Sequence, residues 1–405
     1  MMKVMYYTIE GFDTPNANNH LALTMLETFL KSGIEVYLLQ SDRSGPDPKI
    51  PESLAKYDIF SCDYVKRKPA PKNNFIARYF EGIKYALDSR KIWKQKARDV
   101  DVILVQSTYL SWLSLRLLKS LHKPIVFSIF DLFPNVVFDV GASSNKLIYN
   151  ALLKLQNIAY NCSDRIVVIT DDVKQKLLAR GIDEKKLVKI VNWFDEDKIS
   201  EIPALDNQFI QRYDLNKDKF YVQYAGNFGF TFNYKYVLQV AEKLKNHPKI
   251  ILQMIGSGTF ESEFKQEATE KGLTNIEFYP WQSLDIISDV YSACSIGFIP
   301  LSTGVIGNSY PSKLSLIMAC GRTFVTCADM NTHYAKDIKK HEIGICVSDN
   351  APEEAAKAIL ELYENKNLRN RYADNAKKYT YEQYGSKNNA IKFVDVIEEM
   401  ANYGK

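Results

Sequence analysis

The sequence predicts an α/β protein with two domains, each built on a parallel sheet. Its 405 residues suit two or three domains of roughly 100 to 200 residues. Short apolar runs rich in Val, Ile, Tyr and Phe alternate with longer segments of helical periodicity, which is the pattern of parallel α/β proteins. The alternation stops in a charged, proline-containing passage near residues 192–208 and then starts again. That interruption predicts an interdomain linker.

The individual elements follow from periodicity. Apolar runs too short for helices predict buried strands, in the first half at 3–9, 35–40, 102–107, 124–130 and 165–170. In the second half the corresponding runs lie at 220–226, 250–256, 275–280, 296–301, 323–328 and 343–347. Helical spacing lies between the runs, as in 20–33, where Gly33 supplies a stop. After Pro352 the chain is expected to be helical to its end.

Composition excludes several classes of protein. With 46% hydrophobic and 25% charged residues the chain is neither disordered nor collagen-like, and a net charge of +4 does not by itself indicate nucleic acid. The six cysteines are far apart and form no CxxC, which fits a reduced cytoplasmic compartment. The start lacks a signal-peptide pattern. The longest uncharged stretch, 290–312, contains Pro300 and Pro311, so no membrane-spanning helix is expected.

Small residues after two strands of the second half indicate a ligand site, because open parallel sheets bind ligands beyond the carboxyl ends of their strands. AGNFGF follows the strand at 220–226, and GSG follows the strand at 250–256. Neither completes GxGxxG, since Glu261 stands where the third glycine belongs. A dinucleotide fingerprint is therefore unsupported, and an ordinary strand-to-helix turn stays open for GSG.

The stretch 298–325 is the most informative. A strand is expected to end near Pro300, followed by a loop and a short helix, and the notable residues of that passage are Gly304, Gly307, Asn308, Ser309, Pro311 and Gly321. Asn308 and Ser309 are capping candidates, Pro311 suits a first helical turn, and Gly321 suits a helix end. Free N–H groups at such a helix start, with Lys313, form an anion site. The alternative is an ordinary capped helix with a solvated lysine.

Several blocks resemble a known family. PSKLSLIMACGR (311–322) resembles the signature of bacterial family 4 retaining glycosyltransferases of the GT-B fold, especially those that build capsular, exopolysaccharide and O-antigen repeat units. AGNFG (225–229) resembles the first loop of their donor domain, and FDLFPN (130–135) their acidic DLWP-like motif. GSG, YPW, SACSIGFIPL, VITDDVKQKL and VNWFD occur in the family's order. The similarity runs along nearly the whole chain.

The resemblance implies two Rossmann-like, doubly wound domains facing across a cleft. An acceptor-binding domain is expected over 1–195 and a donor-binding domain over 196–375. A C-terminal helix over 376–405 is expected to pack back on the first domain. By the same resemblance, the donor pyrophosphate lies near Gly226, Asn227, Gly229, Gly307, Asn308, Ser309, Pro311, Ser312 and Lys313.

The resemblance also assigns roles around the donor and the acceptor. Tyr279 and Trp281 stand where the family holds the nucleotide base, with packing between strand and helix as the alternative. Asp131 occupies the acidic motif and is the candidate general base toward the acceptor, or else caps the turn before Pro134. His20 is placed on the acceptor side, and its alternative is an exposed histidine at a helix start.

Two departures from the family pattern bear on activity. Many members carry two glutamates seven residues apart, the second of which binds ribose hydroxyls, but those places hold Asn308 and Leu316 here. A basic residue expected after the first glycine loop is replaced by Phe230 or Phe232. Some polysaccharide-assembly members lack the glutamates, so activity is still expected.

No metal or cofactor is expected. The DVD of 99–101 imitates the DxD motif of another glycosyltransferase fold, but it precedes a strand, where acidic residues usually solvate the start of the strand. The remaining histidines show no ligand spacing.

Charge is concentrated in one segment. Residues 66–98 hold eleven Lys and Arg against Glu81 and Asp88, an excess of nine positive charges in a chain of net charge +4. Apolar residues recur there at helical spacing, which predicts a basic amphipathic helix on an anionic membrane surface. A solvated helix covering the core is the alternative, and no nucleic-acid motif accompanies the charge. The candidate membrane-surface residues are Lys66, Arg67, Lys68, Lys72, Arg78 and Lys84.

The family resemblance, together with the basic segment, implies a cytoplasmic glycosyltransferase, peripheral to the inner face of the cell membrane. It would move a sugar from a nucleoside-diphosphate donor, with a UDP-sugar favoured, to a polyprenyl-diphosphate-linked saccharide. Two alternatives stay open. One is a nucleotide-sugar epimerase of similar architecture. The other is a non-catalytic partner of another transferase, which the leucine at 316 favours.

Overall fold

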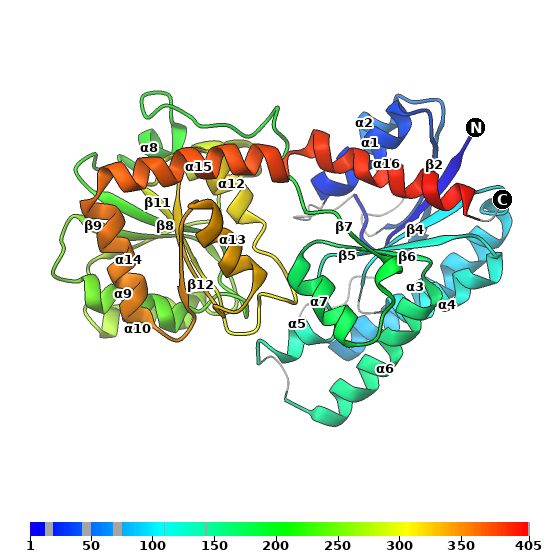
Figure 1. Ribbon diagram of the computed structural model, residues 1–405, viewed down its shortest axis with the longest axis horizontal. Helices are drawn as coiled ribbons and strands as arrows, with labels where there is room; N and C mark the ends of the chain where they lie inside the picture. The colour runs from blue at the N-terminus through cyan, green and yellow to red at the C-terminus, as the bar shows by residue number, and fades with distance from the viewer. Residues whose placement is uncertain (13–18, 43–49, 68–74, 109, 142–143, 404–405) are drawn as a thin grey trace. The chain divides into compact units, whose positions relative to one another are not determined.

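The computed structural model describes residues 1–12, 19–42, 50–67, 75–108, 110–141 and 144–403 (Figure 1). They form two compact units. The first comprises Met1–Asn135, Ser144–Asn192 and Lys387–Lys405, and the second Val136–Ser143 and Trp193–Ser386. The chain therefore passes between the units four times. The domain boundaries expected from the sequence lie at 195/196 and 375/376. They do not separate the segment 136–143 from the first unit, and the last of them lies before the observed division at 386/387.

The first unit contains a seven-stranded parallel sheet in the order β3-β2-β1-β4-β5-β6-β7. Its strands are β1 (Lys3–Tyr7), β2 (Glu35–Asp42), β3 (Phe60–Lys66), β4 (Val102–Gln106), β5 (Ile125–Ile129), β6 (Arg165–Val168) and β7 (Leu187–Lys189). Every residue of β4 and β5 is buried. Burial on both faces explains their continuous apolar sequences, since helices cover both sides of such a sheet.

The sequence did not predict the two edge strands of this sheet, β3 and β7. Strand β3 carries the sequence FSCDYVK and buries only Val65. Strand β7 has three residues, of which only Leu187 is buried. An edge strand pairs on one side only and is partly exposed, so neither strand has the continuous apolar sequence that identified the central strands.

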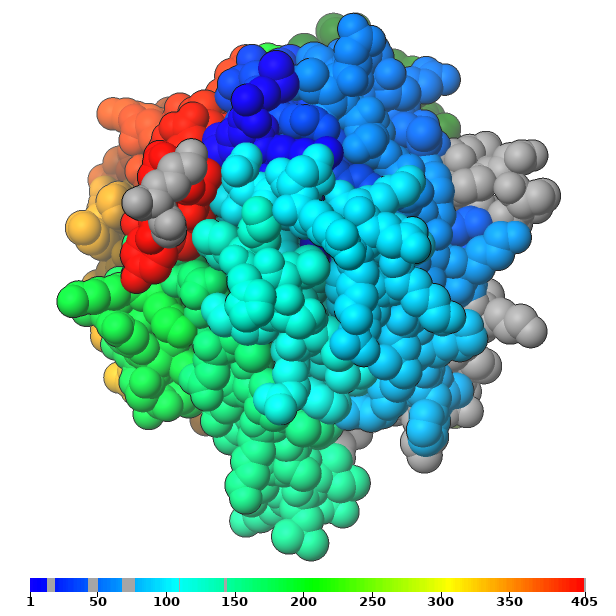
Figure 2. All heavy atoms as spheres, turned by 90° about the vertical axis from the view of Figure 1, so that its right-hand side faces the viewer, coloured from blue at the N-terminus to red at the C-terminus, as the bar shows by residue number. Residues whose placement is uncertain are grey.

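The helices of the first unit are α1 (Asn19–Lys31), α2 (Glu52–Ala55), α3 (Phe75–Lys96), α4 (Ser111–Leu118), α6 (Lys146–Cys162), α7 (Asp171–Ala179) and, near the C-terminus, α16 (Ser386–Asn402). Helix α5 (Asn135–Phe138) begins at the last residue before the chain enters the second unit. Helix α4 packs against both α3 and α6, so these three form a continuous layer, and the start of α6 projects from it (Figure 2). Trp93 of α3 and Tyr160 of α6 are fully buried beneath this layer.

The second unit contains a six-stranded parallel sheet in the order β10-β9-β8-β11-β12-β13. Its strands are β8 (Phe220–Asn227), β9 (Ile250–Ser257), β10 (Ile276–Tyr279), β11 (Ile296–Pro300), β12 (Phe324–Ala328) and β13 (Ile345–Ser348). All six coincide with predicted strands to within a few residues. Its helices are α8 (Gln208–Tyr213), α9 (Tyr234–Leu244), α10 (Glu261–Glu270), α11 (Ile287–Ser292), α12 (Lys313–Ala319), α13 (His333–His341), α14 (Pro352–Glu364) and α15 (Lys366–Tyr384).

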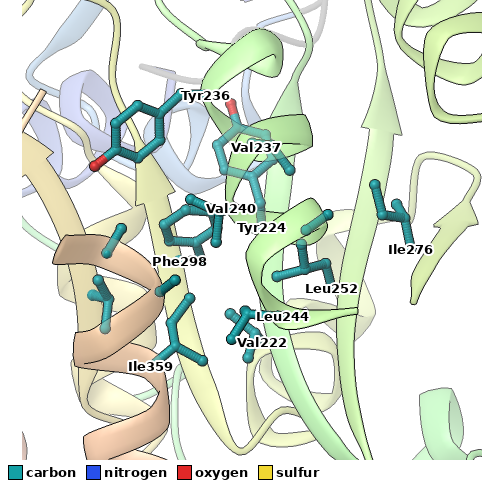
Figure 3. Close-up of a cluster of buried hydrophobic side chains, with 14 of the residues drawn as sticks. Val222, Tyr224, Tyr236, Val237, Val240, Leu244, Leu252, Ile276, Phe298 and Ile359 are labelled. Atoms are coloured by element: carbon teal, nitrogen blue, oxygen red, sulfur yellow. The ribbon is translucent and has the colours of Figure 1, made fainter. Parts of the chain in front are cut away.

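One apolar cluster packs α9, α10 and α14 against the second sheet. Val222 and Leu252 from the strands meet Leu244 and Ile359 from the helices (Figure 3). Tyr224 lies at one end of the cluster, and its hydroxyl points away from Val222 and Leu244. Because the strand runs from Val222 to Tyr224, this orientation brings a polar atom toward the carboxyl end of β8.

The C-terminal helix is tied to the first unit by charge. Arg165, at the start of β6, forms an ion pair with Glu399 of α16, and its guanidinium lies 5.8 Å from the ring centroid of Tyr403. The preceding turn is held in the second unit, where Ser386 donates from its N–H to Glu196 at 2.7 Å and Phe194 donates from its N–H to the Tyr384 carbonyl at 3.0 Å.

Candidate functional site

The strand order of the second sheet marks the edge at which sheets of this class bind ligands. Strands β8 and β11 are neighbours, but the chain leaves β8 toward β9 and leaves β11 toward β12. The connections thus diverge at this point, and open parallel sheets bind ligands beyond the carboxyl ends of the strands where they do so. Here Gly226 and Asn227 end β8, and Pro300 ends β11 before the loop that leads to Lys313.

Lys313, the first residue of α12, places a cation at this edge. Its Nζ lies 3.2 Å from the Tyr224 hydroxyl oxygen, to which it donates, and 4.4 Å from the centroid of the Tyr224 ring. Burial lowers the pKa of Lys313 from 10.5 to about 8. The loss of hydrating water disfavours the ammonium, and within the described residues no carboxylate pairs with it to offset that loss.

Gly226 lets the lysine reach Tyr224. A Cβ atom on Gly226 would lie 3.0 Å from Cε and 3.1 Å from Nζ of Lys313, so a side chain there would displace the amine. The Tyr224 hydroxyl, which accepts from Lys313, donates to the Asn227 carbonyl at 2.9 Å. The glycine, the tyrosine and the lysine therefore form one arrangement at the end of β8.

The GSG sequence supports this loop from the neighbouring strand. A Cβ atom on Gly256 would lie 1.9 Å from the Gly226 carbonyl oxygen, and one on Gly258 would lie 2.3 Å from Oδ1 of Asn227. These glycines are required because the two loops touch, which favours the strand-to-helix turn over a direct ligand contact. Asn227 itself is exposed, and Gly229 is buried beside its side chain.

The loop between β11 and α12 is organised from within. The N–H groups of Asn308 and Ser309 both donate to the Val305 carbonyl at 3.0 Å, and Gly307 adopts φ +90°. Asn308 is fully buried, and its side chain donates to the Gly304 carbonyl and to Asp139.

The expectation that Asn308 or Ser309 caps α12 is wrong. The helix begins only at Lys313, and Ser312 occupies the position before it. Pro311 lies outside the helix, and its carbonyl accepts from the N–H of Leu314 at 2.9 Å. Ser312 is exposed, and Leu316 lies one turn further along α12, partly exposed.

Tyr279 and Trp281, the two aromatic residues expected near the nucleotide base, have different surroundings. Tyr279 packs edge-on against Tyr213, with ring centroids 4.9 Å apart, and donates to Glu277 at 2.5 Å. Its ring is used in packing between β10 and α8, as the alternative interpretation expects. Trp281 is 57% exposed, so its indole face is accessible to a planar ligand.

In the first unit, both predicted acceptor-side residues lie at loops that follow strands. Asp131 is exposed two residues after β5 and precedes the cis peptide bond between Phe133 and Pro134. His20 is exposed and is the second residue of α1, the helix that follows β1. Both side chains are therefore at the carboxyl edge of the first sheet.

One predicted membrane-surface residue is contradicted by the structure. Arg67 is buried, forms an ion pair with Glu81 at 2.9 Å and donates to the Ile9 carbonyl at 3.1 Å, so it serves the interior of the unit. Lys66 is exposed at the end of β3, Arg78 is half-buried, and Lys84 is exposed beside Asp88. Lys68 and Lys72 lie outside the described residues.

Exposed apolar side chains accompany the basic residues. On α3, Phe80 is 67% exposed and Leu87 48% exposed, and at the projecting start of α6, Leu147 is 81% exposed and Ile148 50% exposed. Helices α3, α4 and α6 together carry nine Lys and Arg against two acidic residues. We call these three helices the basic layer.

The DVD sequence has a structural role. Lys3 donates from its N–H to Asp101 at 2.8 Å and from Nζ to Asp99 at 2.9 Å, so both carboxylates stabilise the amino ends of the strands. Within the described residues, no group of three or more His, Cys, Asp or Glu could hold a metal ion. None of the described helices is long and apolar enough to span a bilayer.

Comparison with known proteins accounts for both units. Residues 19–198 match the family described as Glycosyltransferase Family 4, and residues 206–379 match Glycosyl transferases group 1. The chain belongs to the family 4 glycosyltransferases. Its two Rossmann-like parallel-sheet units are those of the GT-B fold.

Two curated relatives are described as glycosyltransferases. The chain is 26% identical over 240 residues to the probable glycosyltransferase WbjE of Pseudomonas aeruginosa, covering 59% of this chain and 60% of that one. It is 24% identical over 204 residues to the putative colanic acid biosynthesis glycosyl transferase WcaI of Escherichia coli K12, covering 49% of each. The matches thus span about half to three fifths of these relatives.

A solved structure shares the fold. Anabaena Alr3699/HepE in complex with UDP superposes with a TM-score of 0.74 at 13% identity, covering 98% of this chain and 100% of that one.

The predicted site omits two residues that the structure brings to this edge, Tyr224 and Asp139. Tyr224 had a signal, because it precedes Gly226 by two residues on a strand and therefore shares its face. Asp139 had none, since it is 169 residues from its partner Asn308.

The shifted pKa of Lys313 predicts a pH-dependent stability. Below about pH 8 Lys313 is charged in both the folded and the unfolded protein, and burial of the charge lowers the free energy of unfolding. Between about pH 8 and 10.5 the lysine of the folded protein loses its proton, so this destabilisation disappears. We expect Lys313→Met to be more stable than the wild type by about 2 kcal/mol at pH 7, and the difference to vanish as pH rises to 10.5. Urea unfolding across this range measures it. Lys217→Met, an exposed substitution of the same kind in the second unit, is the control.

Proposed function

We propose that this protein transfers a sugar from a nucleoside-diphosphate donor, UDP-linked by preference, to a polyprenyl-diphosphate-linked saccharide in cell-surface polysaccharide assembly. The observation that carries the proposal is the ammonium of Lys313, held at the divergence point of the second sheet with its pKa lowered by burial. A diphosphate bound there would supply the missing negative charge. The carboxyl edge of β8 and β11 is where this fold class binds such ligands.

The reaction assigns different work to the two units. The bond between the anomeric carbon of the sugar and the diphosphate oxygen breaks, and a bond to the acceptor hydroxyl oxygen forms. Lys313 stabilises the negative charge that develops on the leaving diphosphate, so no metal ion is required. Asp131, exposed at the carboxyl edge of the first sheet, accepts the proton of the acceptor hydroxyl. We further propose that the anomeric configuration is retained, as the family resemblance implies.

UDP is the favoured nucleotide because HepE, which shares the fold, has been solved with UDP and with UDP-glucose. Trp281 offers an exposed ring on which a base can stack. The side chain of Leu316, at the position of the family's ribose-binding glutamate, cannot accept a hydrogen bond. We therefore infer a modest affinity for the nucleotide.

A lipid-linked acceptor is consistent with the basic layer. Its excess of positive charge attracts anionic headgroups, and Phe80, Leu87, Leu147 and Ile148 provide apolar side chains that are already exposed. Amphipathic surfaces of this kind lie in the membrane interface with their apolar groups inserted. The protein would thus work at the cytoplasmic face of the cell membrane.

Lys313→Ala should weaken UDP binding at least tenfold, since a charge-assisted contact to phosphate contributes about 1.5 to 3 kcal/mol. EDTA should leave the wild-type Kd unchanged. Isothermal titration with UDP measures both effects, and Lys217→Ala is the matched control. A wild-type Kd that EDTA abolishes, or a Lys313→Ala variant that binds like the wild type, would place the donor elsewhere.

Asp131→Asn should lower sugar transfer roughly 100-fold or more while the Kd for UDP stays within about twofold. Transfer is measured as label moving from radioactive UDP-sugars to synthetic polyprenyl-diphosphate-linked N-acetylglucosamine. Equal transfer by the variant removes Asp131 from the mechanism. UDP binding without any transfer favours the non-catalytic alternative, and epimerised UDP-sugar without acceptor favours the epimerase.

Replacing Lys84, Lys91 and Lys94 by Gln should reduce binding to vesicles that contain phosphatidylglycerol about a hundredfold, at roughly 1 kcal/mol per charge. The double variant Leu147→Gln/Ile148→Gln should also bind less, because it removes the inserted side chains. Sedimentation with vesicles tests both variants. Leu205→Gln is the control, since Leu205 is equally exposed, at 81%, in the second unit. Unchanged sedimentation of both variants and at high salt contradicts the membrane role.

A further inference from the structure

A segment from the first half of the sequence completes the loop before Lys313. Residues Val136–Ser143 belong to the second unit, although the chain on both sides of them belongs to the first. Their contact with the loop is made at Gly304, where a Cβ atom would lie 2.8 Å from Cβ and 2.9 Å from the carbonyl oxygen of Asp139. Gly304 also adopts φ +81°. Both the backbone conformation and the close approach therefore require glycine at this position.

The same contact holds a carboxylate in place. Nδ2 of Asn308 donates to the Gly304 carbonyl at 2.6 Å and to Oδ2 of Asp139 at 2.7 Å. Asn308 is fully buried, whereas Asp139 is exposed. A hydrogen bond from a neutral amide to an ionised carboxylate is stronger than one between neutral groups. The buried amide thus fixes the position of a carboxylate that solvent can reach.

Asn308 and Asp139 complement each other as hydrogen-bond donor and acceptor. The family resemblance places a glutamate at the position of Asn308, so many members carry a carboxylate on this loop. In this chain the loop carries an amide, and a carboxylate from position 139 lies within hydrogen-bond distance of it. A glutamate at 308 would place two carboxylates together, which is unfavourable. The amide at 308 can donate a hydrogen bond to the carboxylate at 139, which an ionised glutamate there could not do.

We propose that Asp139 determines sugar specificity in the donor site, by accepting hydrogen bonds from hydroxyl groups of the sugar on the bound nucleoside diphosphate. The inference rests on the proposed function, because it takes the diphosphate to bind at Lys313. The loop that Asp139 contacts ends at Lys313, five residues after Asn308. The sugar is joined directly to the diphosphate, so a carboxylate held against this loop by Asn308 is placed to meet its hydroxyls. Asn308 acts through Asp139 and is a positioning residue.

The test separates recognition of the sugar from recognition of the nucleotide. Isothermal titration gives the Kd for UDP and the lowest Kd among UDP-glucose, UDP-galactose and UDP-N-acetylglucosamine. We expect Asp139→Asn to raise the Kd of the UDP-sugar about tenfold while the Kd for UDP stays within about twofold. The double variant Asp139→Asn/Asn308→Asp moves the carboxylate to the buried position 308, where a sugar hydroxyl cannot reach it, and should therefore not recover the preference. Asp218→Asn, an exposed change at the amino end of β8, is the control.

Each other outcome overturns the proposal. If Asp139→Asn leaves the ratio of the two Kd values unchanged, the carboxylate does not contact the sugar. If it weakens UDP and UDP-sugar equally and lowers the melting temperature, Asp139 only holds the loop. In both cases a loss of UDP binding in Lys313→Ala would leave the proposed function intact. If the wild type binds no UDP, the proposed function and this inference fall together.

Discussion

The arrangement of the candidate site in the second unit depends on one partly desolvated charge. The ammonium of Lys313 rests against Tyr224, whose ring is part of the apolar core and whose hydroxyl accepts the lysine's hydrogen bond. That contact exists because Gly226 has no side chain, and Gly226 in turn is approached by Gly256 from the next strand. Tyr224, Gly226 and Gly256, on two neighbouring strands, thus keep the ammonium of Lys313 in a place where burial lowers its pKa. An anionic ligand relieves that cost on binding, so the energy stored in folding contributes to recognition.

The fold could be predicted from sequence wherever a strand is buried on both faces. The central strands of both sheets are continuous apolar runs and were identified in this way. The partly exposed edge strands β10 and β13 of the second sheet were identified as well, because their sequences, IEFY and ICVS, stay largely apolar. The edge strands β3 and β7 were not, because partial exposure allows polar residues such as Asp63 and Lys189 into them. The segment at 136–143 was also missed. It joins the second unit through contacts with residues far along the chain, and no local pattern encodes such contacts.

In the candidate site, too, residues within sequence motifs could be predicted, whereas contacts between residues far apart in the sequence could not. Gly226 and Lys313 were predicted because they stand in motifs, and the structure brings them together. Asn308 was expected to cap a helix, which was wrong because α12 begins five residues later. Arg67 was expected at the surface on the strength of a charged segment, whereas its partner Glu81 draws it into the interior. A count of charges locates a basic segment. Whether one basic side chain of that segment is buried depends on whether a carboxylate or carbonyl inside the unit can pair with it.

The four passages of the chain between the units limit how this protein can be divided or recombined. Cutting once near Asn192 would give an amino-terminal piece without the helix that carries Glu399, and a carboxyl-terminal piece without Asp139. Neither piece would contain all of its own unit. A hybrid that exchanges residues 193–386 with a relative would likewise combine one protein's loop with the other's segment at 136–143. Natural exchange of donor-binding halves within the family would therefore succeed only when both stretches travel together or already match.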